Sequence, residues 1–467
     1  MYDTIIIGGG PGGYLAAERL GHFEKKVLLI EENYLGGTCL NVGCIPTKTL
    51  INSAKQYAHA QDARKFGITI PEVAFDWGAI QSWKNEVVDK LKSGVAAQMK
   101  RFSVEVMDGR GEIAAAPSGT APGKVRVTAP DGSVSEAEGR TILIAAGSAP
   151  VMPPIPGTAG NPLVMDSSAL LSIKSVPEKL VIIGGGVIGV EFASLFSALG
   201  SQVTVIEMMD DIIPFMDREQ TPLLRRAMRK VDFKLGCKVE KIENSTVHFT
   251  GKDGTPGTAD GDAILMAVGR KPVITGWGAE NAGVSAGPKG VTVDEFMRTG
   301  AEGIWAAGDV TGRSLLAHTA YRMAEVAVTD IVRFLDSNSG LQPDAMNYAA
   351  IPWAVYGLTE AAGIGMTEQD AEKQGITVRK ASVPMRFSGR FAAENTFAGQ
   401  GAVKVIADAK TEKIIGIHAV GAYASEFIWG GAPIIEGGLT ISGVKKFIFP
   451  HPTVCELIRD ALWELPG

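Results

Sequence analysis

The chain has 467 residues, an apolar share of 45%, a charged share of 21% and a net charge of −6. No long basic run and no apolar run of membrane-spanning length occurs, so the composition argues against nucleic acid, an anionic membrane surface and a transmembrane helix. Four cysteines are too few for a secreted disulfide scaffold, and the first strand begins almost at once. We therefore expect a cytoplasmic protein without a leader segment, of about three domains by length.

An apolar run over residues 3–7 leads into the glycine-rich turn 8–13, and the residues through Leu20 have helical character. This is the Gly-x-Gly-x-x-Gly pattern of a dinucleotide-binding unit. Its first glycine permits the turn, its second lets a pyrophosphate approach, and its third lets helix and strand pack closely. The next strand, 27–30, ends at Glu31, which is placed to accept a ribose hydroxyl. The predicted contacts here are Gly8, Gly10, Pro11, Gly13 and Glu31.

Two cysteines follow within a few residues of Glu31. Cys39 comes after a glycine-rich turn, and Cys44 opens a predicted helix that runs to about Ala63, with Pro46 in its first turn. The positive end of the helix dipole favours a thiolate at Cys44, as a redox cysteine requires. Taken alone, the pair is equally compatible with inert buried thiols or with half of a metal site, although a metal centre needs further Cys or His at close spacing.

The stretch 36–48, GGTCLNVGCIPTK, resembles the active-site signature of the FAD-dependent pyridine nucleotide–disulfide oxidoreductases, and within that family it most resembles the dihydrolipoamide dehydrogenases. The resemblance implies that Cys39 is the interchange thiol and Cys44 the charge-transfer thiolate, with Lys48 near the reactive flavin nitrogen. A disulfide does not readily take a hydride from nicotinamide, whereas a flavin does, so the first dinucleotide is assigned as FAD. Gly37 and Thr38 join the predicted FAD contacts.

The segment after the signature predicts a long helix over 76–101 and short strands at 104–106, 111–113 and 124–127. Gly111, in the second of these strands, is a further predicted FAD contact. The run 141–148 predicts a buried strand ending in small residues, and it resembles the family segment that returns to the FAD. Ala146 and Gly147 are expected to contact FAD there, through the backbone only, because Ala146 stands where the family has threonine. The proline-rich stretch 149–157 predicts a linker.

A second complete glycine fingerprint follows. A strand over 180–183 leads into the turn 184–189 and a helix to Leu199, and the strand 203–206 is closed by Glu207. This carboxylate would accept a ribose hydroxyl and repel a 2′-phosphate, so we predict NAD and not NADP. The predicted NAD contacts are Gly184, Gly186, Val187, Ile188, Gly189, Glu191, Glu207, Val239 and Gly269.

Charged residues around this second unit receive separate interpretations. Glu191 resembles the family glutamate that pairs with the flavin-side lysine, here Lys48. By sequence alone it could equally be a carboxylate in the first helical turn that interacts with the helix dipole. Arg218, Arg225 and Arg226 are expected on a solvated helix face.

The run 303–309 predicts a strand with which the chain returns to the first domain. By resemblance Asp309 holds the ribityl chain of FAD, and it could also cap the helix predicted near Leu315. The following segment resembles the part of the family beside the flavin ring, so its histidine is predicted to bind and not to catalyse. The predicted FAD contacts in that segment are Leu315, Leu316, Ala317 and His318.

From about Tyr348 the chain resembles the C-terminal interface domain of the family, with predicted strands at 377–379, 402–406 and 413–418. The resemblance implies that His451 is the base that deprotonates a substrate thiol. It also implies that Glu456 orients the imidazole of His451 and favours its charged form. It also implies that His451 reaches the disulfide of the partner subunit, so that the protein is a homodimer. The His451–Pro452 bond is a candidate cis peptide.

Three features depart from the dihydrolipoamide dehydrogenases: Phe449-Pro450 replaces His-Ala, the segment 356–360 lacks the usual Pro-Glu, and Cys455 lies beside the base. Alternatives are a reductase of another disulfide such as glutathione, a mercuric reductase, and a mainly structural subunit of a multienzyme complex. Glu207 argues against the glutathione-type reductase, because it disfavours the NADP that is common there. A mercuric reductase would need a C-terminal cysteine pair, which this chain lacks. Co-purification with a multienzyme complex would test the structural subunit.

We predict an α/β chain with two Rossmann-like dinucleotide-binding domains and a C-terminal α+β interface domain. The expected division is 1–149 for FAD, 150–275 for NAD, 276–346 for the return to the central domain, and 347–467 for the interface. The expected activity is oxidation of dihydrolipoamide to lipoamide through a Cys39–Cys44 disulfide and FAD, with reduction of NAD. The alternative is NADH-dependent reduction of another disulfide or acceptor. Expected partners are a second copy, a lipoyl-bearing protein and a 2-oxoacid dehydrogenase or glycine-cleavage complex, with no metal.

Overall fold

The computed structural model describes residues 1–397 and 399–465, and the chain divides into two compact units. The first unit consists of Met1–Thr49, Ala79–Val151 and Gly269–Met346, and the second of Leu50–Gly78, Met152–Val268 and Asn347–Gly467. Helices α3 (Cys44–Asp62) and α4 (Trp77–Arg101) each contribute residues to both units, and both match their predicted spans closely. Among the described residues, no helix combines the length and the apolar character needed to cross a membrane.

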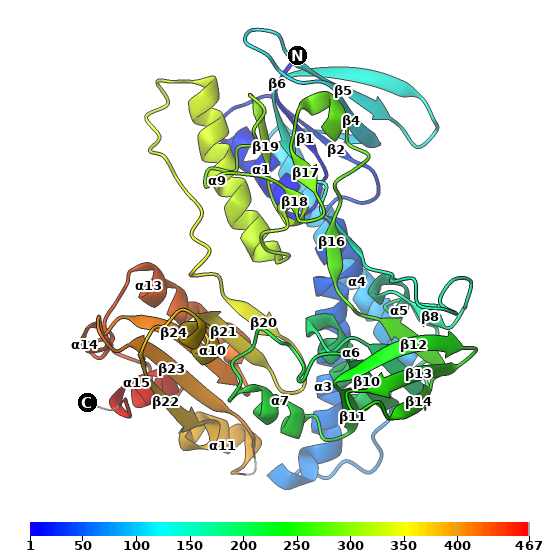
Figure 1. Cartoon of the computed structure of the whole chain (residues 1–467), viewed down its shortest axis with the longest axis vertical. Coiled ribbons are helices and arrows are strands. Elements are labelled where there is room, and N and C mark those ends of the chain that lie inside the picture. Colours follow the sequence, from blue (N-terminus) through cyan, green and yellow to red (C-terminus); the bar gives the residue numbers. More distant parts are fainter. Residues whose placement is uncertain (398, 466–467) are drawn as a thin grey trace. The chain divides into compact units, whose positions relative to one another are not determined.

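The first unit is built on a mixed sheet with the strand order β3-β2-β1-β6-β5-β4, and β19 also pairs with β6 (Figure 1). Parallel pairing joins β1, β2, β3, β6 and β19, whereas β4 and β5 are antiparallel. Ile5, Leu28 and Leu143 are fully buried, as expected for parallel strands covered on both faces. The strands are β1 (Tyr2–Ile7), β2 (Val27–Glu31), β3 (Glu105–Asp108), β4 (Arg110–Ala115), β5 (Gly123–Thr128), β6 (Val134–Ile144) and β19 (Ile304–Ala306).

The turn between β1 and helix α1 (Pro11–His22) contains a contact that only glycine permits. Gly8 has a φ of +104°, and a Cβ on Gly13 would lie 1.8 Å from the carbonyl oxygen of Gly8. In the second unit a Cβ on Gly189 would lie 2.0 Å from the carbonyl oxygen of Gly184. In both turns the helix therefore packs against its strand at backbone contact, which explains the first and third glycines of each motif.

The second unit contains a parallel sheet with the order β11-β10-β9-β15-β8, and helix α6 (Val187–Ala198) follows β9. An antiparallel sheet of β12, β13 and β14 shares a buried core with it, which includes Ile183, Val247 and Phe249. The strands are β8 (Val164–Met165), β9 (Lys179–Ile183), β10 (Gln202–Glu207), β11 (Val231–Leu235), β12 (Cys237–Glu243), β13 (Thr246–Gly251), β14 (Pro256–Asp260) and β15 (Ala263–Met266).

The C-terminal part of the second unit is an antiparallel sheet with the order β20-β21-β24-β23-β22. Helix α15 (Glu456–Trp463) packs on β22 and β23 and buries Leu457 in the same core as Val405 and Ile417. The strands are β20 (Trp353–Val355), β21 (Ala361–Gly365), β22 (Val378–Pro384), β23 (Ala402–Asp408) and β24 (Ile414–Val420). The remaining helices used below are α7 (Thr221–Ala227), α9 (Ala317–Leu335) and α10 (Glu368–Lys373).

Two strand predictions were too long at their carboxyl ends. The strand predicted over 141–148 ends at Ile144, because Gly147 turns the chain with a φ of +72°. The strand predicted over 303–309 covers only Ile304–Ala306, and Asp309 begins a 3-10 turn. The suggestion that Asp309 caps the next helix is wrong: Leu316 is at the N-cap of α9, with no side-chain cap.

The expectation of a solvated arginine face on a helix is wrong in part: Arg218 is exposed but lies before the helix, and Arg225 lies on the helix but is paired. Arg218 precedes α7 and donates hydrogen bonds to Glu368 at 2.7 Å and to Glu372 at 2.9 Å. Arg225 lies on α7 but pairs with Asp211 at 2.8 Å. These acidic partners are distant in sequence or outside the helix, so helical spacing did not reveal them.

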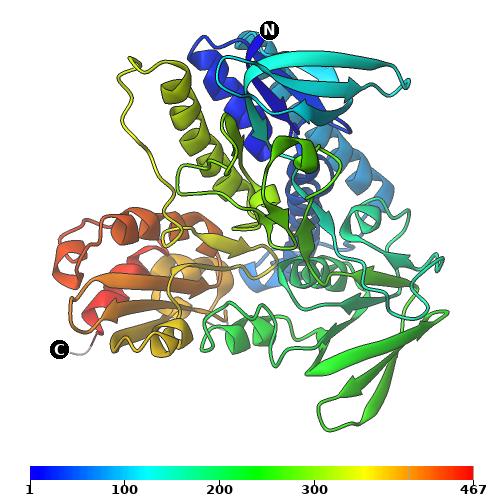
Figure 2. The same cartoon turned by 45° about the horizontal axis from the view of Figure 1, so that its top comes forward.

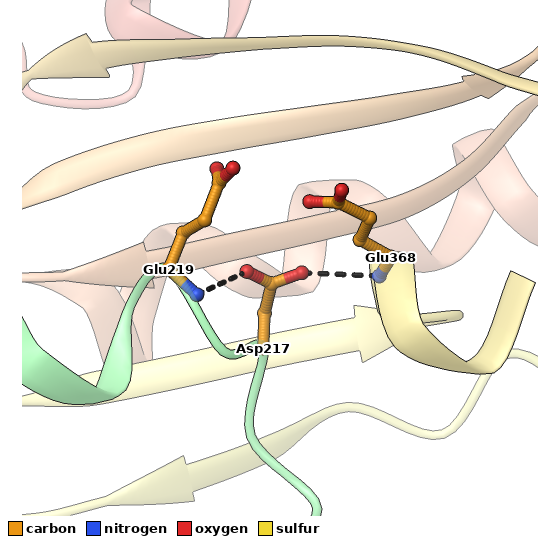
Figure 3. Close-up of side chains that lie close together, drawn as sticks. All are labelled: Asp217, Glu219 and Glu368. Atoms are coloured by element: carbon orange, nitrogen blue, oxygen red, sulfur yellow. Dashed lines mark hydrogen bonds between the residues drawn. The ribbon is translucent and has the colours of Figure 1, made fainter. Parts of the chain in front are cut away.

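Lys404 is fully buried in β23. Its side chain lies among the carboxylates of Asp217, Glu219 and Glu368, which are the three side chains drawn in Figure 3. Its Nζ lies 2.9 Å from Asp217 Oδ1, 2.9 Å from Glu219 Oε2 and 2.7 Å from Glu368 Oε2. Asp217 also accepts the backbone N–H groups of Glu219 and Glu368. Three carboxylates this close could suggest a metal site, but the ammonium of Lys404 already lies within reach of all three. Arg218 donates to Glu368 and Lys380 donates to Glu219, so three cations compensate the three carboxylates, and the cluster is a structural element.

The lysine-centred cluster (Asp217, Glu219, Glu368 and Lys404) is connected to the second glycine turn. Burial raises the pKa of Glu368, but hydrogen bonds from Lys380, Lys404 and Arg218 outweigh burial and lower it to about 2. The segment between Glu207 and Asp217 touches the turn midway, where the N–H of Ile213 donates to the carbonyl oxygen of Gly185 at 2.9 Å. The cluster thus fixes the far end of a segment that supports the turn.

We predict that Gly13→Ala destabilises the protein by about 1–3 kcal/mol or more, because the added methyl group overlaps the backbone of Gly8. Gly94→Ala in α4 is the matched control. A Cβ there meets no atom within 4 Å, and the change should stabilise by about 0.5–1 kcal/mol. Thermal unfolding of both variants beside the parent checks this, and equal melting temperatures for the two would contradict it.

We predict that Lys404→Met destabilises the second unit by about 3–5 kcal/mol, because it leaves buried carboxylates without their counter-charge. Lys373→Met is the control, since Lys373 is an exposed partner of Asp370 and its loss should cost less than about 1 kcal/mol. Urea midpoints measure both effects. Indistinguishable midpoints would show that the buried ammonium does not stabilise the fold.

Candidate active site

The predicted FAD contacts of the first unit gather at one edge of its sheet. Glu31 ends β2, Ala146 and Gly147 follow β6, and Asp309 follows β19, while the glycine turn follows β1. Because these strands are parallel, their carboxyl ends meet at the same edge. β1 lies between β2 and β6, so the strands that follow β1 are added to the sheet on both of its sides. Open α/β sheets bind nucleotides in the crevice at such a switch point.

The first turns of α1 and α6 are suited to phosphate groups. Gly10 and Gly186 occupy the N-cap positions in extended conformation, and no side chain in the described part of the chain caps either helix. A Cβ on Gly10 would meet only the Cα of Gly37, at 3.8 Å, and a Cβ on Gly186 would meet nothing within 4 Å. Uncapped N–H groups and the helix dipole attract phosphate. The residues present therefore fit one dinucleotide at each turn.

A carboxylate lies beside each turn in the same way. Glu31 accepts the N–H of Gly9 at 2.6 Å, and Glu207 accepts the N–H of Gly185 at 2.5 Å. The other oxygen of Glu207 accepts the N–H of Met209 at 2.7 Å. Both carboxylates are thereby held where a ribose would follow the pyrophosphate, and each retains lone pairs for a hydroxyl.

The two cysteines of the signature meet across a break between helices. Cys39 lies in α2 (Gly37–Val42), Gly43 interrupts, and α3 begins at Cys44. The two side chains form a hydrogen bond, and both are free thiols in this structure. The break is tight, because a Cβ on Gly43 would lie 2.8 Å from the carbonyl oxygen of Thr38. The pair therefore has the contact that disulfide formation requires.

The surroundings of Cys39 shift the pKa of its thiol. The hydrogen bond to Cys44 and burial raise the pKa of Cys39, whereas the charge of Lys48 lowers it. Because two thiolates in contact repel each other, the pair disfavours ionisation of both sulfurs at once. Two thiols in contact are suited to thiol–disulfide exchange.

Asp309 belongs to a polar chain that the sequence did not indicate. Its Oδ2 accepts the hydroxyl of Ser148 at 2.6 Å, and the Nε of Arg270 donates to Ser148 Oγ at 2.8 Å. Burial raises the pKa of Asp309, while the Ser148 hydrogen bond and the charge of Arg270 oppose that rise. Arg270 opens β16 (Arg270–Pro272), which pairs with β7 (Ser148–Pro150) at the predicted linker.

In the second unit, α6 binds the segment that departs from the family pattern. Glu191 is almost fully buried and accepts the N–H of Tyr356 at 3.1 Å. Ser194, one turn further, accepts the N–H of Leu358 at 2.9 Å. The departure at 356–360 is therefore accommodated by backbone hydrogen bonds to this helix. The pairing of Glu191 with Lys48 stays a prediction.

His451 and Glu456 lie together as predicted. Nδ1 of His451 is 3.0 Å from Glu456 Oε1, the imidazole side chain is 78% exposed, and Glu456 is 10% exposed. Burial raises the pKa of Glu456, but the N–H of Thr453, His451 and Arg459 outweigh burial and lower it. The His451–Pro452 bond is cis, which confirms that prediction. With a buried carboxylate on Nδ1 and most of the imidazole exposed, the other ring nitrogen has no need to satisfy that carboxylate.

The remaining predicted contacts have defined places but no tested role. Val239 lies in β12 beside the antiparallel core, and His318 is in the first turn of α9. A Cβ on Gly111 would lie 3.3 Å from Ile30, which fits a close packing role. For the other predicted contacts a role in cofactor binding stays a prediction: Pro11, Thr38, Val187, Ile188, Gly269, Leu315, Leu316 and Ala317.

Besides the chain through Asp309, sequence reasoning missed the lysine-centred cluster and a pair of tyrosines. A single lysine inside the apolar run of β23 was the available signal for the buried Lys404. No signal pointed to the contact between Tyr14 and Tyr321, whose hydroxyls are hydrogen bonded across 307 positions of sequence.

Comparison with known proteins agrees with this geometry. Residues 2–324 match the pyridine nucleotide-disulphide oxidoreductase family, and residues 351–462 match its dimerisation domain. The chain is 36% identical to a dihydrolipoamide dehydrogenase of Chaetomium thermophilum, over 98% of this chain and 90% of that protein. It is 35% identical to dihydrolipoyl dehydrogenase 3 of Pseudomonas putida, over 100% of this chain and 98% of that protein.

Solved structures extend the comparison. LpdA from Mycobacterium tuberculosis has a TM-score of 0.89 and 26% identity, with both chains fully covered. The HOCl-induced flavoprotein disulfide reductase RclA from Escherichia coli has a TM-score of 0.84 and 31% identity, again with both chains fully covered. The predicted fold class, the oxidoreductase class and the cofactors FAD and NAD are confirmed. This chain belongs to the pyridine nucleotide–disulfide oxidoreductase family.

Proposed function

We propose that this protein is a dihydrolipoamide dehydrogenase, which oxidises dihydrolipoamide to lipoamide and reduces NAD. The observation that carries the proposal is the hydrogen-bonded Cys39–Cys44 pair beside an FAD-type glycine turn. The curated relatives named above, which match over nearly the whole chain, support this substrate. When bound, FAD and NAD supply the acceptors that carry the two electrons away from the sulfur centre.

The residues of the chain then have the following roles. His451, oriented by Glu456, takes a proton from a substrate thiol, and the resulting thiolate attacks Cys39. The Cys39–Cys44 bond breaks, and Cys44 keeps its electron pair as a thiolate beside Lys48. The second substrate thiol attacks the mixed disulfide, releases oxidised lipoamide and leaves Cys39 as a thiolate, which takes the proton. The substrate is oxidised by two electrons and the protein disulfide is reduced by two.

We also propose the predicted assembly and division of the chain. His451 would act on the redox disulfide of the partner subunit in a homodimer, for which the dimerisation-domain match is the support. A lipoyl-bearing protein of a 2-oxoacid dehydrogenase or glycine-cleavage complex would deliver the substrate. The composition, with only four cysteines, suits a cytoplasmic protein. The domain boundaries 149/150, 275/276 and 346/347 remain part of this proposal.

A second candidate is the NADH-dependent reduction of another disulfide. Two observations favour it: the likeness to RclA, a disulfide reductase, and the Phe449-Pro450 departure beside the His451–Glu456 pair. Assays of the purified protein distinguish the two. Rapid NAD reduction by dihydrolipoamide supports the first candidate, and NADH oxidation by other disulfides without lipoamide turnover supports the second.

We predict that Cys44→Ser abolishes lipoamide turnover while FAD stays bound, because the disulfide can no longer form although the glycine turn is untouched. Cys237→Ser, a change outside the signature, is the matched control and should keep full turnover. Flavin absorbance and NAD reduction are measured together. Normal turnover of Cys44→Ser would overturn the disulfide mechanism.

We predict that His451→Gln lowers lipoamide turnover by about 10²–10⁴-fold, since the substrate thiol loses its base. NADH oxidation by an artificial acceptor should persist, because it needs no thiol deprotonation. His248→Gln is the control, as His248 also pairs with a glutamate, Glu243, at 3.1 Å but far from the signature in sequence. Equal loss of both activities in His451→Gln would count against the base.

A further inference from the structure

The loop that carries His451, residues 448–453, has little backbone support. Within the described chain no backbone–backbone hydrogen bond involves this loop: the last one before it joins Phe447 to Val444, and the next joins Leu457 to Val454. Packing does not hold the imidazole either, because its side chain is 78% exposed. The position of the imidazole therefore depends on hydrogen bonds made by side chains.

Thr453 organises the loop from within. Its N–H donates to Glu456 Oε2 at 2.9 Å, and its Oγ1 donates to the carbonyl oxygen of Pro450 at 2.7 Å. Glu456 is also the carboxylate that lies 3.0 Å from Nδ1 of His451. Thr453 thus joins the loop to the same carboxylate that the imidazole contacts, so a shift of Thr453 would move His451 relative to Glu456.

One hydrogen bond reaches this loop from another part of the chain. Oγ of Ser388 donates to the carbonyl oxygen of Thr453 at 3.0 Å, across 65 positions of sequence. Among the residues that the structure describes, no other hydrogen bond joins 448–453 to a residue outside 448–456. Ser388 is buried, so water competes little for this bond.

Ser388 is itself held firmly. It is the N-cap of α11 (Gly389–Asn395), where its Oγ accepts the N–H of Phe391 at 3.3 Å, and its own N–H donates to the carbonyl oxygen of Met385 at 3.0 Å. Met385 and Phe391 are buried in the same core as Leu457 of α15. Both views show α15, in red, against the orange strands of this sheet (Figures 1 and 2).

The hydroxyl of Ser388 does more than cap a helix. A cap requires only an oxygen that accepts an N–H, and this oxygen serves Phe391 in that way. A serine hydroxyl also has one proton to donate, and here that proton is directed to Thr453. The two uses are compatible, and together they connect a core helix end to the loop of the base.

We propose that Ser388 is a positioning residue for the thiol base: it fixes the loop 448–453 so that His451 stays against Glu456 in one orientation. Ser388 forms and breaks no bond in the reaction. A base must be held in place to meet the substrate thiol, and small displacements reduce the rate strongly. This inference rests on the assignment of His451 as the base under the proposed function, and it deepens that function by adding the residue that supports the base.

The test uses the FAD-loaded holoenzyme and three variants. Ser388→Ala removes both the cap and the bond to Thr453, whereas Ser388→Thr keeps a hydroxyl for both. Thr440→Ala is the matched control, because Thr440 caps α14 (Ile441–Val444) through its Oγ1, which accepts the N–H of Gly443 at 3.2 Å. The measurements are NAD reduction by dihydrolipoamide, NADH oxidation by ferricyanide, melting temperature, and amide hydrogen exchange of the peptide 448–457.

Ser388→Ala is expected to lower lipoamide turnover about tenfold and to raise exchange of the peptide about fivefold, with ferricyanide reduction unchanged. Ser388→Thr should restore both values to those of the parent. Thr440→Ala should lower the melting temperature about as much as Ser388→Ala does, since each loses a cap, but should change neither turnover nor exchange.

Two results would overturn the inference. One is equal exchange of the peptide 448–457 in the parent and in Ser388→Ala, which decides the matter whatever the substrate is. The other is equal lipoamide turnover in Ser388→Ala and Thr440→Ala. A parent protein that does not oxidise dihydrolipoamide would instead overturn the proposed function, while the exchange measurement still decides whether Ser388 holds the loop.

Discussion

The redox pair depends on how closely backbone can approach backbone at three glycines. Gly13 lets α1 rest on the strand β1, Gly37 lets α2 rest on the start of α1, and Gly43 ends α2 so that Cys39 and Cys44 meet. Each contact would be filled by a single methyl group. The sulfur centre and the first dinucleotide turn are thus one rigid construction, so the position of the thiols follows from the packing that forms the nucleotide site.

Charge is distributed differently in the two units. Around Cys39, the hydrogen bond from Cys44 and burial raise the pKa of the thiol, and the charge of Lys48 opposes that rise. Around Lys404, the three carboxylates are compensated by three cations, Lys404, Arg218 and Lys380, and the pKa of Glu368 is held low, so these charges stay fixed. Burial of charge therefore serves reactivity in the first case and connection between distant segments in the second.

The sequence revealed the parts of the site that are local in the chain. Both glycine turns and the cysteine pair each lie within a few residues, so their spacing suggested their geometry, and the His451–Glu456 pair was expected from the family resemblance. The buried lysine cluster and the tyrosine pair escaped because their partners are 187 and 307 positions apart. Strand ends such as Ile144 were also misjudged, since a positive φ at Gly147 stops the strand where the apolar pattern continues.

The Lys404 cluster also constrains how such a chain can be divided during evolution or by proteolysis. Asp217 precedes and Lys404 follows the boundary between the two family matches, at residues 324 and 351. A fragment that ends at this boundary keeps Asp217 and Glu219 without Lys404, and the complementary fragment keeps Lys404 with Glu368 as its remaining carboxylate. Exchange of the C-terminal segment with that of a distant homologue would therefore succeed only where the incoming strand supplies an equivalent lysine.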